Sequence, residues 1–154
     1  MLIWEQSGLE KVMDELEIMN SNPFYNELFY GKGKVEPKDI LEELQDIKPP
    51  RFRYVVKENG KNAAIVEYLL NNPKDGKPWI GFLMVAKGYQ KQGIARKVYT
   101  ACEQELRKMK LAALRLGILN GNSPAFSFWS RMGFSEINIK ESQGRKIHIF
   151  EKQL

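Results

Sequence analysis

The chain has 154 residues, 43% of them hydrophobic, which predicts one domain, residues 1–154, with a substantial core. Its single cysteine, Cys102, excludes a disulfide framework and a cysteine-rich metal site, so we expect no metal. The sequence has no signal h-region and no apolar run of membrane-spanning length, so we expect a cytoplasmic protein with no membrane partner. Residues 1–46 hold 4 basic and 11 acidic side chains, whereas residues 47–154 hold 20 basic and 8 acidic ones. The net charge of +5 is therefore unevenly distributed and does not indicate a continuous basic surface, so we expect no nucleic-acid partner.

The N-terminal part is predicted to be mainly helical. A short strand, Leu2 to Trp4, precedes Ser7-Gly8-Leu9-Glu10, a capping box that predicts the start of a helix. Apolar residues then recur at helical spacing, and a second helix begins near Pro37. Between the two helices, the aromatic and glycine-bearing segment 22–35 is predicted to be a loop with some helical turn.

Three turn signals predict three β-hairpins in the rest of the chain. Asn and Asp before Gly favour the positive φ angles of tight hairpin turns. The hairpins join residues 52–57 to 63–70 through Asn59-Gly60, residues 63–70 to 79–86 through Asp75-Gly76, and residues 134–140 to 146–150 through Gln143-Gly144.

An alternation of helix and strand separates the second hairpin from the third. Apolar residues at helical spacing predict a helix over residues 94–109, and alternation predicts a strand over 114–118. Ser123 is predicted to cap a short helix with Pro124 at its first position, and Gly133 to end it. The predicted order is therefore β-α-α-β-β-β-α-β-α-β-β.

The segment Gln90–Ala95 lies between the end of a predicted strand and the start of a predicted helix. The first amides of a helix lack internal partners, and the helix dipole adds partial positive charge there. Gly93 has no Cβ, so a ligand oxygen can approach the backbone closely. Positive charge is added by Lys87, Lys91, Arg96 and Lys97, with no acid among them. The expected ligand is an anion, a pyrophosphate, although such a glycine can also be an ordinary turn residue.

Two motifs and the terminal hairpin carry a resemblance to a known family. Gln90–Ala95 resembles an Arg/Gln-x-x-Gly-x-Gly/Ala signature, and Asn122–Phe134 resembles an Asn-x-x-Ala-x-x-Phe-Tyr-x-x-x-Gly-Phe pattern. Over essentially its whole length the chain resembles the GNAT superfamily of acetyl-CoA-dependent N-acetyltransferases. The resemblance implies an α/β (α+β) fold, with a mixed, mostly antiparallel sheet of about seven strands flanked by about four helices. It also implies direct acetyl transfer from acetyl-CoA to a primary amine of a small molecule or peptide, by a monomer or homodimer.

The resemblance further implies roles for individual residues. The backbone of Met84 and Val85 would pair with the pantetheine arm like an added strand, and the Val85 amide would polarise the thioester carbonyl. The amides from Gln90 to Ala95 would hold the pyrophosphate, Asn122 would hydrogen-bond the cofactor, and Phe128 would pack beside it. The implied cofactor-binding residues are Met84, Val85, Gln90, Lys91, Gln92, Gly93, Ile94, Ala95, Arg96, Asn122, Phe128 and Trp129.

The sequence departs from the family where an acid and a base are expected. Trp129 stands where a tyrosine acid often lies, and because indole is far too weak an acid, we expect it to pack near the thioester instead. Trp79 stands where many relatives carry a base. Glu67 on the preceding strand is a candidate base, acting directly or through water, but an ordinary outward-facing strand residue is favoured. His148 and Tyr99 are expected to be structural, Tyr99 on the helix surface. The acid and base assignments therefore stay open.

Two further questions stay open at this level. One alternative function is a non-catalytic acyl-CoA-binding sensor that lacks acid and base. A cationic acceptor, such as a polyamine or an amino-sugar-like compound, would follow if the acidic N-terminal helices line the acceptor cleft, because one sign of charge concentrates the opposite sign. The competing and favoured interpretation is a solvated helix face. The carboxylates concerned are Glu10, Asp14, Glu15, Glu17, Asp39, Glu42, Glu43 and Asp46.

Overall fold

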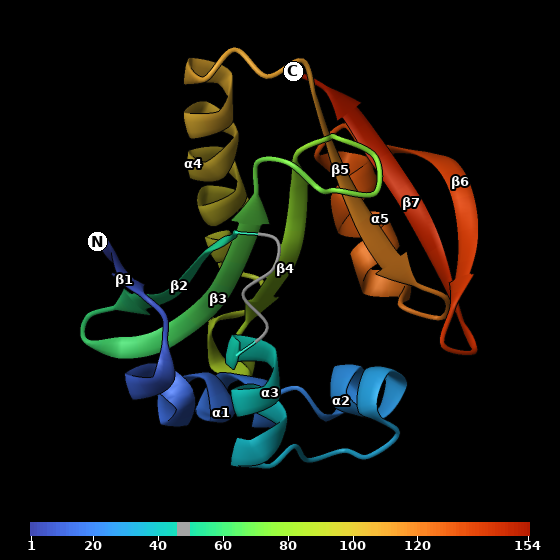
Figure 1. The fold of residues 1–154 in the computed structure, drawn as a ribbon. Helices are drawn as coiled ribbons and strands as arrows, with labels where there is room; N and C mark the ends of the chain where they lie inside the picture. Colours follow the sequence, from blue (N-terminus) through green and yellow to red (C-terminus); the bar gives the residue numbers. More distant parts are fainter. Residues whose placement is uncertain (46–49) are drawn as a thin grey trace.

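The computed structural model describes residues 1–45 and 50–154, and a seven-stranded sheet forms its centre (Figure 1). The strand order is β1-β2-β3-β4-β5-β7-β6, and every neighbouring pair is antiparallel except β4 and β5, which are parallel. The predicted mixed, mostly antiparallel sheet is therefore confirmed. The strands are β1 (Leu2–Gln6), β2 (Phe52–Glu58), β3 (Lys61–Leu69), β4 (Trp79–Val85), β5 (Ala113–Leu119), β6 (Ser135–Ser142) and β7 (Arg145–Gln153).

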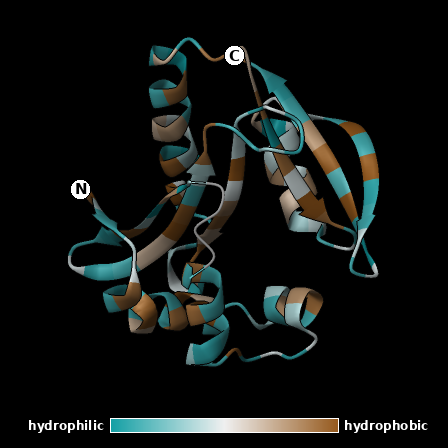
Figure 2. Ribbon diagram, in the orientation of Figure 1, coloured by the Kyte–Doolittle hydropathy of each residue, from teal (hydrophilic) through white to brown (hydrophobic). Residues whose placement is uncertain are grey.

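Helices cover both faces of the sheet. On one face α1 and α3 lie over β2 to β4, and on the other face α4 and α5 pack against the sheet (Figure 1). Both faces carry a core, because the central strand β3 is buried at six consecutive residues, with Ala64 and Val66 in one apolar cluster and Ile65 in the other; Figure 2 shows alternating apolar and polar residues on β6 and β7 instead. Within the described residues the helices are α1 (Val12–Asn20), α2 (Pro23–Tyr30), α3 (Pro37–Gln45), α4 (Ile94–Lys108) and α5 (Ser123–Arg131).

The segment that was predicted to be a loop contains a fifth helix, α2. Pro23 occupies its first turn, where a missing N–H costs nothing, and Gly31 ends it in the left-handed conformation with φ 75°. The buried side chain of Asn26 donates to the carbonyls of Met19 and Gly33, at 2.8 and 3.1 Å. The Asn22-Pro23 and Gly31 signals were thus in the sequence, but the aromatic composition between them obscured the helix.

Two predicted helix caps are wrong by a few residues. The Ser7 hydroxyl donates to the carboxylate of Glu15 and caps no helix; a 3-10 turn over residues 9–11 precedes α1. In α5 the cap is Asn122, whose Oδ1 accepts from the backbone N–H of Ala125 at 3.4 Å, rather than Ser123. Ser7 instead supplies a hydrogen bond to the buried carboxylate of Glu15, and Asn122 lies one residue earlier than Ser123, where its side chain can accept from the helix N-terminus.

The parallel neighbours β4 and β5 separate after a short contact. They are in register only at Trp79 with Arg115 and at Ile80 with Leu116, and beyond Ile80 no further pairs form. At the same place β4 carries a bulge, because Glu67 of β3 lies opposite Phe82 whereas the next residue, Tyr68, lies opposite Ile80. The sheet therefore opens on the β5 side of β4, over residues 81–85.

Candidate functional site

A cleft lies where β4 and β5 separate. It consists of two adjoining cavities of about 700 and 640 Å³. The first extends to α2 and α5, and the second extends to the first turn of α4. Residues common to both cavities are Val85, Gln90, Lys91, Ala95, Phe128 and Arg131.

The backbone of Val85 faces this cleft. Val85 lies opposite Ala64 of β3, and the neighbouring bond runs from the N–H of Ala86 to the carbonyl of Ala63, at 2.8 Å. This pattern makes Val85 and Ala64 a non-hydrogen-bonded pair, in which both backbone polar groups of Val85 point away from β3. The N–H of Val85 is therefore directed toward the opening between β4 and β5.

Asn22, at the start of α2, joins the α2 side of the cleft to β4. Its Nδ2 donates to the Val85 carbonyl at 3.1 Å, and its Oδ1 accepts from Nε2 of Gln90 at 2.6 Å. Gln90 also donates to the Val85 carbonyl, at 2.9 Å. Sequence reasoning missed Asn22, and the signal that could have found it is the Asn-Pro start of a helix.

The loop before α4 has the backbone geometry of an anion site. Gly93 is the N-cap of α4 with φ 80°, and Lys91 also has a positive φ of 63°. Gly93 lines the second cavity, and a Cβ at this position would meet no atom within 4 Å. The unpaired amides of the first turn of α4 adjoin the same cavity, and that turn contains no acidic residue.

The charged side chains that line the cleft are all basic. They are Lys87, Lys91, Arg96 and Arg131, and no Asp or Glu joins them in the described lining. No described carboxylate lies within ion-pair distance of Arg96 or Arg131. A cleft with four uncompensated cations attracts an anionic ligand.

Most of the predicted cofactor-binding residues come together in this cleft. Gln92 does not line it, and its Nε2 instead donates to the carbonyl of Gly88 at 3.1 Å. The residues that line it are Met84, Val85, Gln90, Lys91, Gly93, Ile94, Ala95, Arg96, Asn122, Phe128 and Trp129. Whether they bind a cofactor stays a prediction.

Glu67 is buried, so the interpretation of an outward-facing residue is wrong. Only 6% of it is exposed, and its Oε1 accepts from Nη1 of Arg53 at 3.0 Å and pairs with Nε of Arg51 at 3.2 Å. Its Oε2 lies against Gly81, where a Cβ would collide with it. Glu67 lines neither cavity, but its free oxygen reaches the bulge of β4.

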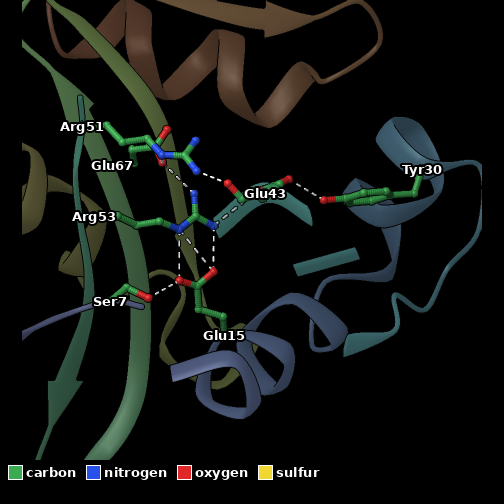
Figure 3. A network of polar contacts seen from close by, with 7 residues as sticks. All are labelled: Ser7, Glu15, Tyr30, Glu43, Arg51, Arg53 and Glu67. Carbon is green, nitrogen blue, oxygen red and sulfur yellow. Dashed lines mark hydrogen bonds and ion pairs between the residues drawn. The ribbon is translucent and has the colours of Figure 1, made fainter. Parts of the chain in front are cut away.

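Glu67 belongs to a buried charge network that joins the N-terminal helices to the sheet (Figure 3). Its centre is Arg53 of β2, which pairs with Glu15 of α1 at 2.7 Å, Glu43 of α3 at 3.2 Å and Glu67. Tyr30 of α2 donates to Glu43 at 2.6 Å. Burial would lower the pKa of Arg53, but the hydrogen bond and charge of Glu15 outweigh it and raise that pKa, so Arg53 stays cationic.

The aromatic residues near the cleft have packing roles. Trp129 is buried, with its ring centroid 5.3 Å from those of Tyr99 and Phe134. Tyr99 is also buried, so its predicted place on the helix surface is wrong, and its hydroxyl donates to Glu103 at 2.6 Å. His148 contacts Glu136 and Asn120 and lines neither cavity, which agrees with a structural role.

The acidic residues of the N-terminal helices do not line the cleft. Asp14 and Glu17 accept from Asn62, Asp39 pairs with Lys32, and Glu15 and Glu43 belong to the charge network. Glu10 and Glu42 line neither cavity either, and Asp46 lies outside the described residues. The acidic lining on which a cationic acceptor depends, the less favoured of the two interpretations, is therefore not found among the described residues, and structural partners hold most of these carboxylates.

Cys102 is expected to be unreactive in the folded protein. Burial raises the pKa of its thiol to about 12, so very little thiolate exists at pH 8. We expect Ellman's reagent to label less than about a tenth of the native protein over an hour, and all of it in guanidinium chloride. Rapid stoichiometric labelling of the native protein would contradict the burial of this side chain.

Two features of other protein classes are absent from the part of the chain that the structure describes. No helix there is both long and apolar enough to cross a bilayer. Residues 1–45 and 50–154 also contain no group of three or more His, Cys, Asp or Glu side chains that could hold a metal ion.

Comparisons with known proteins agree with this architecture. A family model described as the acetyltransferase (GNAT) family matches residues 14–134. An acetyltransferase from Thermus thermophilus superposes with a TM-score of 0.79 at 17% identity, covering 99% of this chain and 97% of the other. The ribosomal-protein-S18-alanine N-acetyltransferase of Escherichia coli gives 0.73 at 17%, covering 99% and 94%. The PaiA N-acetyltransferase of Thermoplasma acidophilum, in complex with coenzyme A, gives 0.70 at 15%, covering 100% and 99%.

Proposed function

Because the chain belongs to the GNAT family of acetyltransferases, we propose that it transfers the acetyl group of acetyl-CoA directly to a primary amine of a small molecule or peptide. The observation that carries this proposal is the Val85 N–H, which faces the opening of the sheet next to a basic, glycine-started helix N-terminus. The coenzyme A in the PaiA complex supports the same class of donor.

The residues of the cleft fit acetyl-CoA. The first amides of α4, together with Lys91, Arg96 and Arg131, would hold the pyrophosphate, while Val85 would pair with the pantetheine arm. The cleft gives the phosphates cations without a competing carboxylate. Asn122 and Phe128 line the cavity on the α5 side, where they would contact the arm.

Acetyl transfer requires that the two substrates are oriented, that a hydrogen-bond donor stabilises the oxyanion, and that one proton can leave the amine. The amine nitrogen bonds to the thioester carbonyl carbon, the C–S bond breaks, and the amine proton ends on the departing thiolate, giving an amide and a thiol. The Val85 N–H would stabilise the oxyanion, a contribution of roughly 3 kcal/mol for one such donor in other enzymes. Because Glu67 lines neither cavity, it would relay the proton through water, from its Oε2 at the bulge beside Gly81.

A thiol-release assay with acetyl-CoA and a panel of amines tests this function. Release that depends on the amine, together with a mass increase of one acetyl group on that amine, supports transfer. Binding of coenzyme A without turnover of any amine would favour the alternative, a non-catalytic acyl-CoA sensor. That alternative is tested because position 129 carries Trp instead of a tyrosine that could act as the acid. If calorimetry detects no binding of coenzyme A, both functions are wrong.

Replacing Trp129 with Phe is expected to leave most of kcat intact. The indole packs against Tyr99 and Phe134, and its N–H is too weak an acid to protonate a thiolate. We expect kcat to fall by less than about fivefold, since only packing changes, and a stability loss of about 1–2 kcal/mol. A fall of a hundredfold or more, in a variant that circular dichroism shows to be folded, would mean that Trp129 takes part in the chemistry.

A further inference from the structure

The seven arginines of the chain differ in whether a carboxylate pairs with them. Arg51, Arg53, Arg107 and Arg115 each pair with at least one carboxylate. Within the described residues, the other three have no such partner. Two of them, Arg96 and Arg131, line the cleft that we assign to phosphates. The third, Arg145, lines neither cavity, but it contacts Phe29 of α2, the helix whose first residues line the larger one.

Arg145 connects the terminal hairpin to α2. It is the first residue of β7, at the tip of the β6–β7 hairpin, which approaches α2 in Figure 1. Its guanidinium carbon lies 4.5 Å from the centre of the Phe29 ring of α2. The side chain is only partly exposed. Arg145 is therefore a partly desolvated cation held in place by an aromatic ring, with its donor groups uncompensated by any described carboxylate.

A tyrosine hydroxyl lies near this cation. Tyr25 stacks on Phe29 with ring centroids 5.8 Å apart, and it lines the larger cavity. Burial raises the pKa of Tyr25 well above its usual value and the charge of Glu43 acts in the same direction, whereas Arg53 and, to a smaller extent, Arg145 lower it. No described residue accepts a hydrogen bond from this hydroxyl. Tyr25 therefore stays protonated and, from the wall of the larger cavity, can donate a hydrogen bond.

Helix α2 connects the Val85 end of the cleft to Arg145. Asn22, at the start of α2, bonds the Val85 carbonyl, while Phe29 lies seven residues later, about 10 Å along the helix axis. An acceptor that lies along α2 would meet the Val85 end with one group and Arg145 with another. A carboxylate is the group that suits a guanidinium fork and a phenol hydroxyl.

We propose that the acceptor is an amine that also carries a carboxylate several bonds away, such as an ω-amino acid, and that Arg145 binds this carboxylate. The proposal rests on the proposed acetyl transfer and names its substrate class. It replaces the expectation of a purely cationic acceptor, whose basis was an acidic lining that the described residues of the cleft do not provide.

The test compares acids with their amides at increasing chain length. Initial rates are measured with glycine, β-alanine, 4-aminobutanoate and 6-aminohexanoate, and with the four corresponding amides. We expect the longer acids to exceed their amides in kcat/KM by about tenfold or more, the size of a charge-assisted hydrogen-bonded pair, mainly through KM. In Arg145→Gln this ratio of acid to amide should fall to about one.

Lys146→Gln is the matched control, because it removes the same charge from the neighbouring, exposed residue of the same hairpin. The acid-to-amide ratio should persist in Lys146→Gln. The proposal is wrong if the wild type uses acids and amides equally, if Lys146→Gln loses the ratio as fully as Arg145→Gln, or if Arg145→Gln keeps it. The last result would leave Arg145 as a structural contact to Phe29.

A binding measurement separates this proposal from the proposed activity. Calorimetry titrates 6-aminohexanoate into the protein in the presence of coenzyme A. Binding by the wild type and Lys146→Gln, with at least about tenfold weaker binding by Arg145→Gln, supports the carboxylate site even if no acetyl transfer occurs. Absence of coenzyme A binding overturns the proposed function alone, and absence of 6-aminohexanoate binding to a protein that binds coenzyme A overturns the carboxylate site.

Discussion

Replacing Gly93 with Leu is expected to reduce the affinity for coenzyme A by at least tenfold, roughly the loss of one or two charge-assisted hydrogen bonds. Gly93 is the N-cap of α4, and the side chain would enter the cavity that we assign to the pyrophosphate. The protein should still fold, because no neighbouring atom lies within 4 Å of the new Cβ. The cost of placing leucine at φ 80° is about 1–2 kcal/mol.

Gly60→Leu is the control for this backbone strain. Gly60 has φ 77°, has open space around it and lies in the β2–β3 turn, away from the cleft. The two variants should lose similar stability in urea unfolding, while only Gly93→Leu should lose affinity in calorimetry. Equal affinity for coenzyme A in both variants would mean that the phosphate site lies elsewhere.

Replacing Arg53 with Met is expected to destabilise the protein by about 3–5 kcal/mol. The substitution removes the only cation paired with Glu15, which is 0% exposed, and one of two cations on Glu67 within the described residues. Two carboxylates then remain buried at short range without full compensation. Urea unfolding at neutral pH measures the loss as a shift in the midpoint.

Two further variants test the cause of that loss. Arg115→Met removes a cation that also bridges two acids, Asp75 and Glu151, but Arg115 has 23% of its side chain exposed, so we expect a loss within about 1 kcal/mol. Adding Glu15→Gln to Arg53→Met should restore part of the stability, because it removes the stranded charge. Equal losses for Arg53→Met and Arg115→Met would show that burial of the network contributes little.

The sheet could be predicted from the sequence because its signals are local. Asn59-Gly60 and Gln143-Gly144 specify hairpin turns, and both residues of each pair have the positive φ that those turns need. The left-handed Gly93 at the start of α4, beside a cavity, followed in the same way from the order of strand, basic loop and glycine, and its binding of phosphate stays a prediction. Residues that are close in sequence and share one backbone requirement leave a pattern that can be identified without the fold.

What escaped prediction depends on contacts between distant residues. Glu67 is a lone carboxylate in an otherwise apolar strand, and its burial is favourable because Arg51 and Arg53, which are distant in sequence, pair with it. The seven described acids of the N-terminal helices look like a solvated face or a cleft lining, and the sequence does not tell which partner each one finds. The Asn22-Pro23 pair indicates the start of a helix but not the bond from Asn22 to Val85, and Arg145 carries no motif, since the contacts of both residues follow from where α2 lies.

The attachment of α2 at its two ends has a consequence for how this protein can change. Asn22 fixes the start of the helix to β4, and Tyr30 fixes its last turn to Glu43. Between them, Phe24 lines the cavity and is exposed, whereas Tyr25 lines it and also packs on Phe82 of β4. Selection can therefore exchange Phe24 to recognise a different acceptor while the Val85 end of the cleft keeps its geometry, which separates the evolution of substrate choice from that of the proposed acetyl transfer.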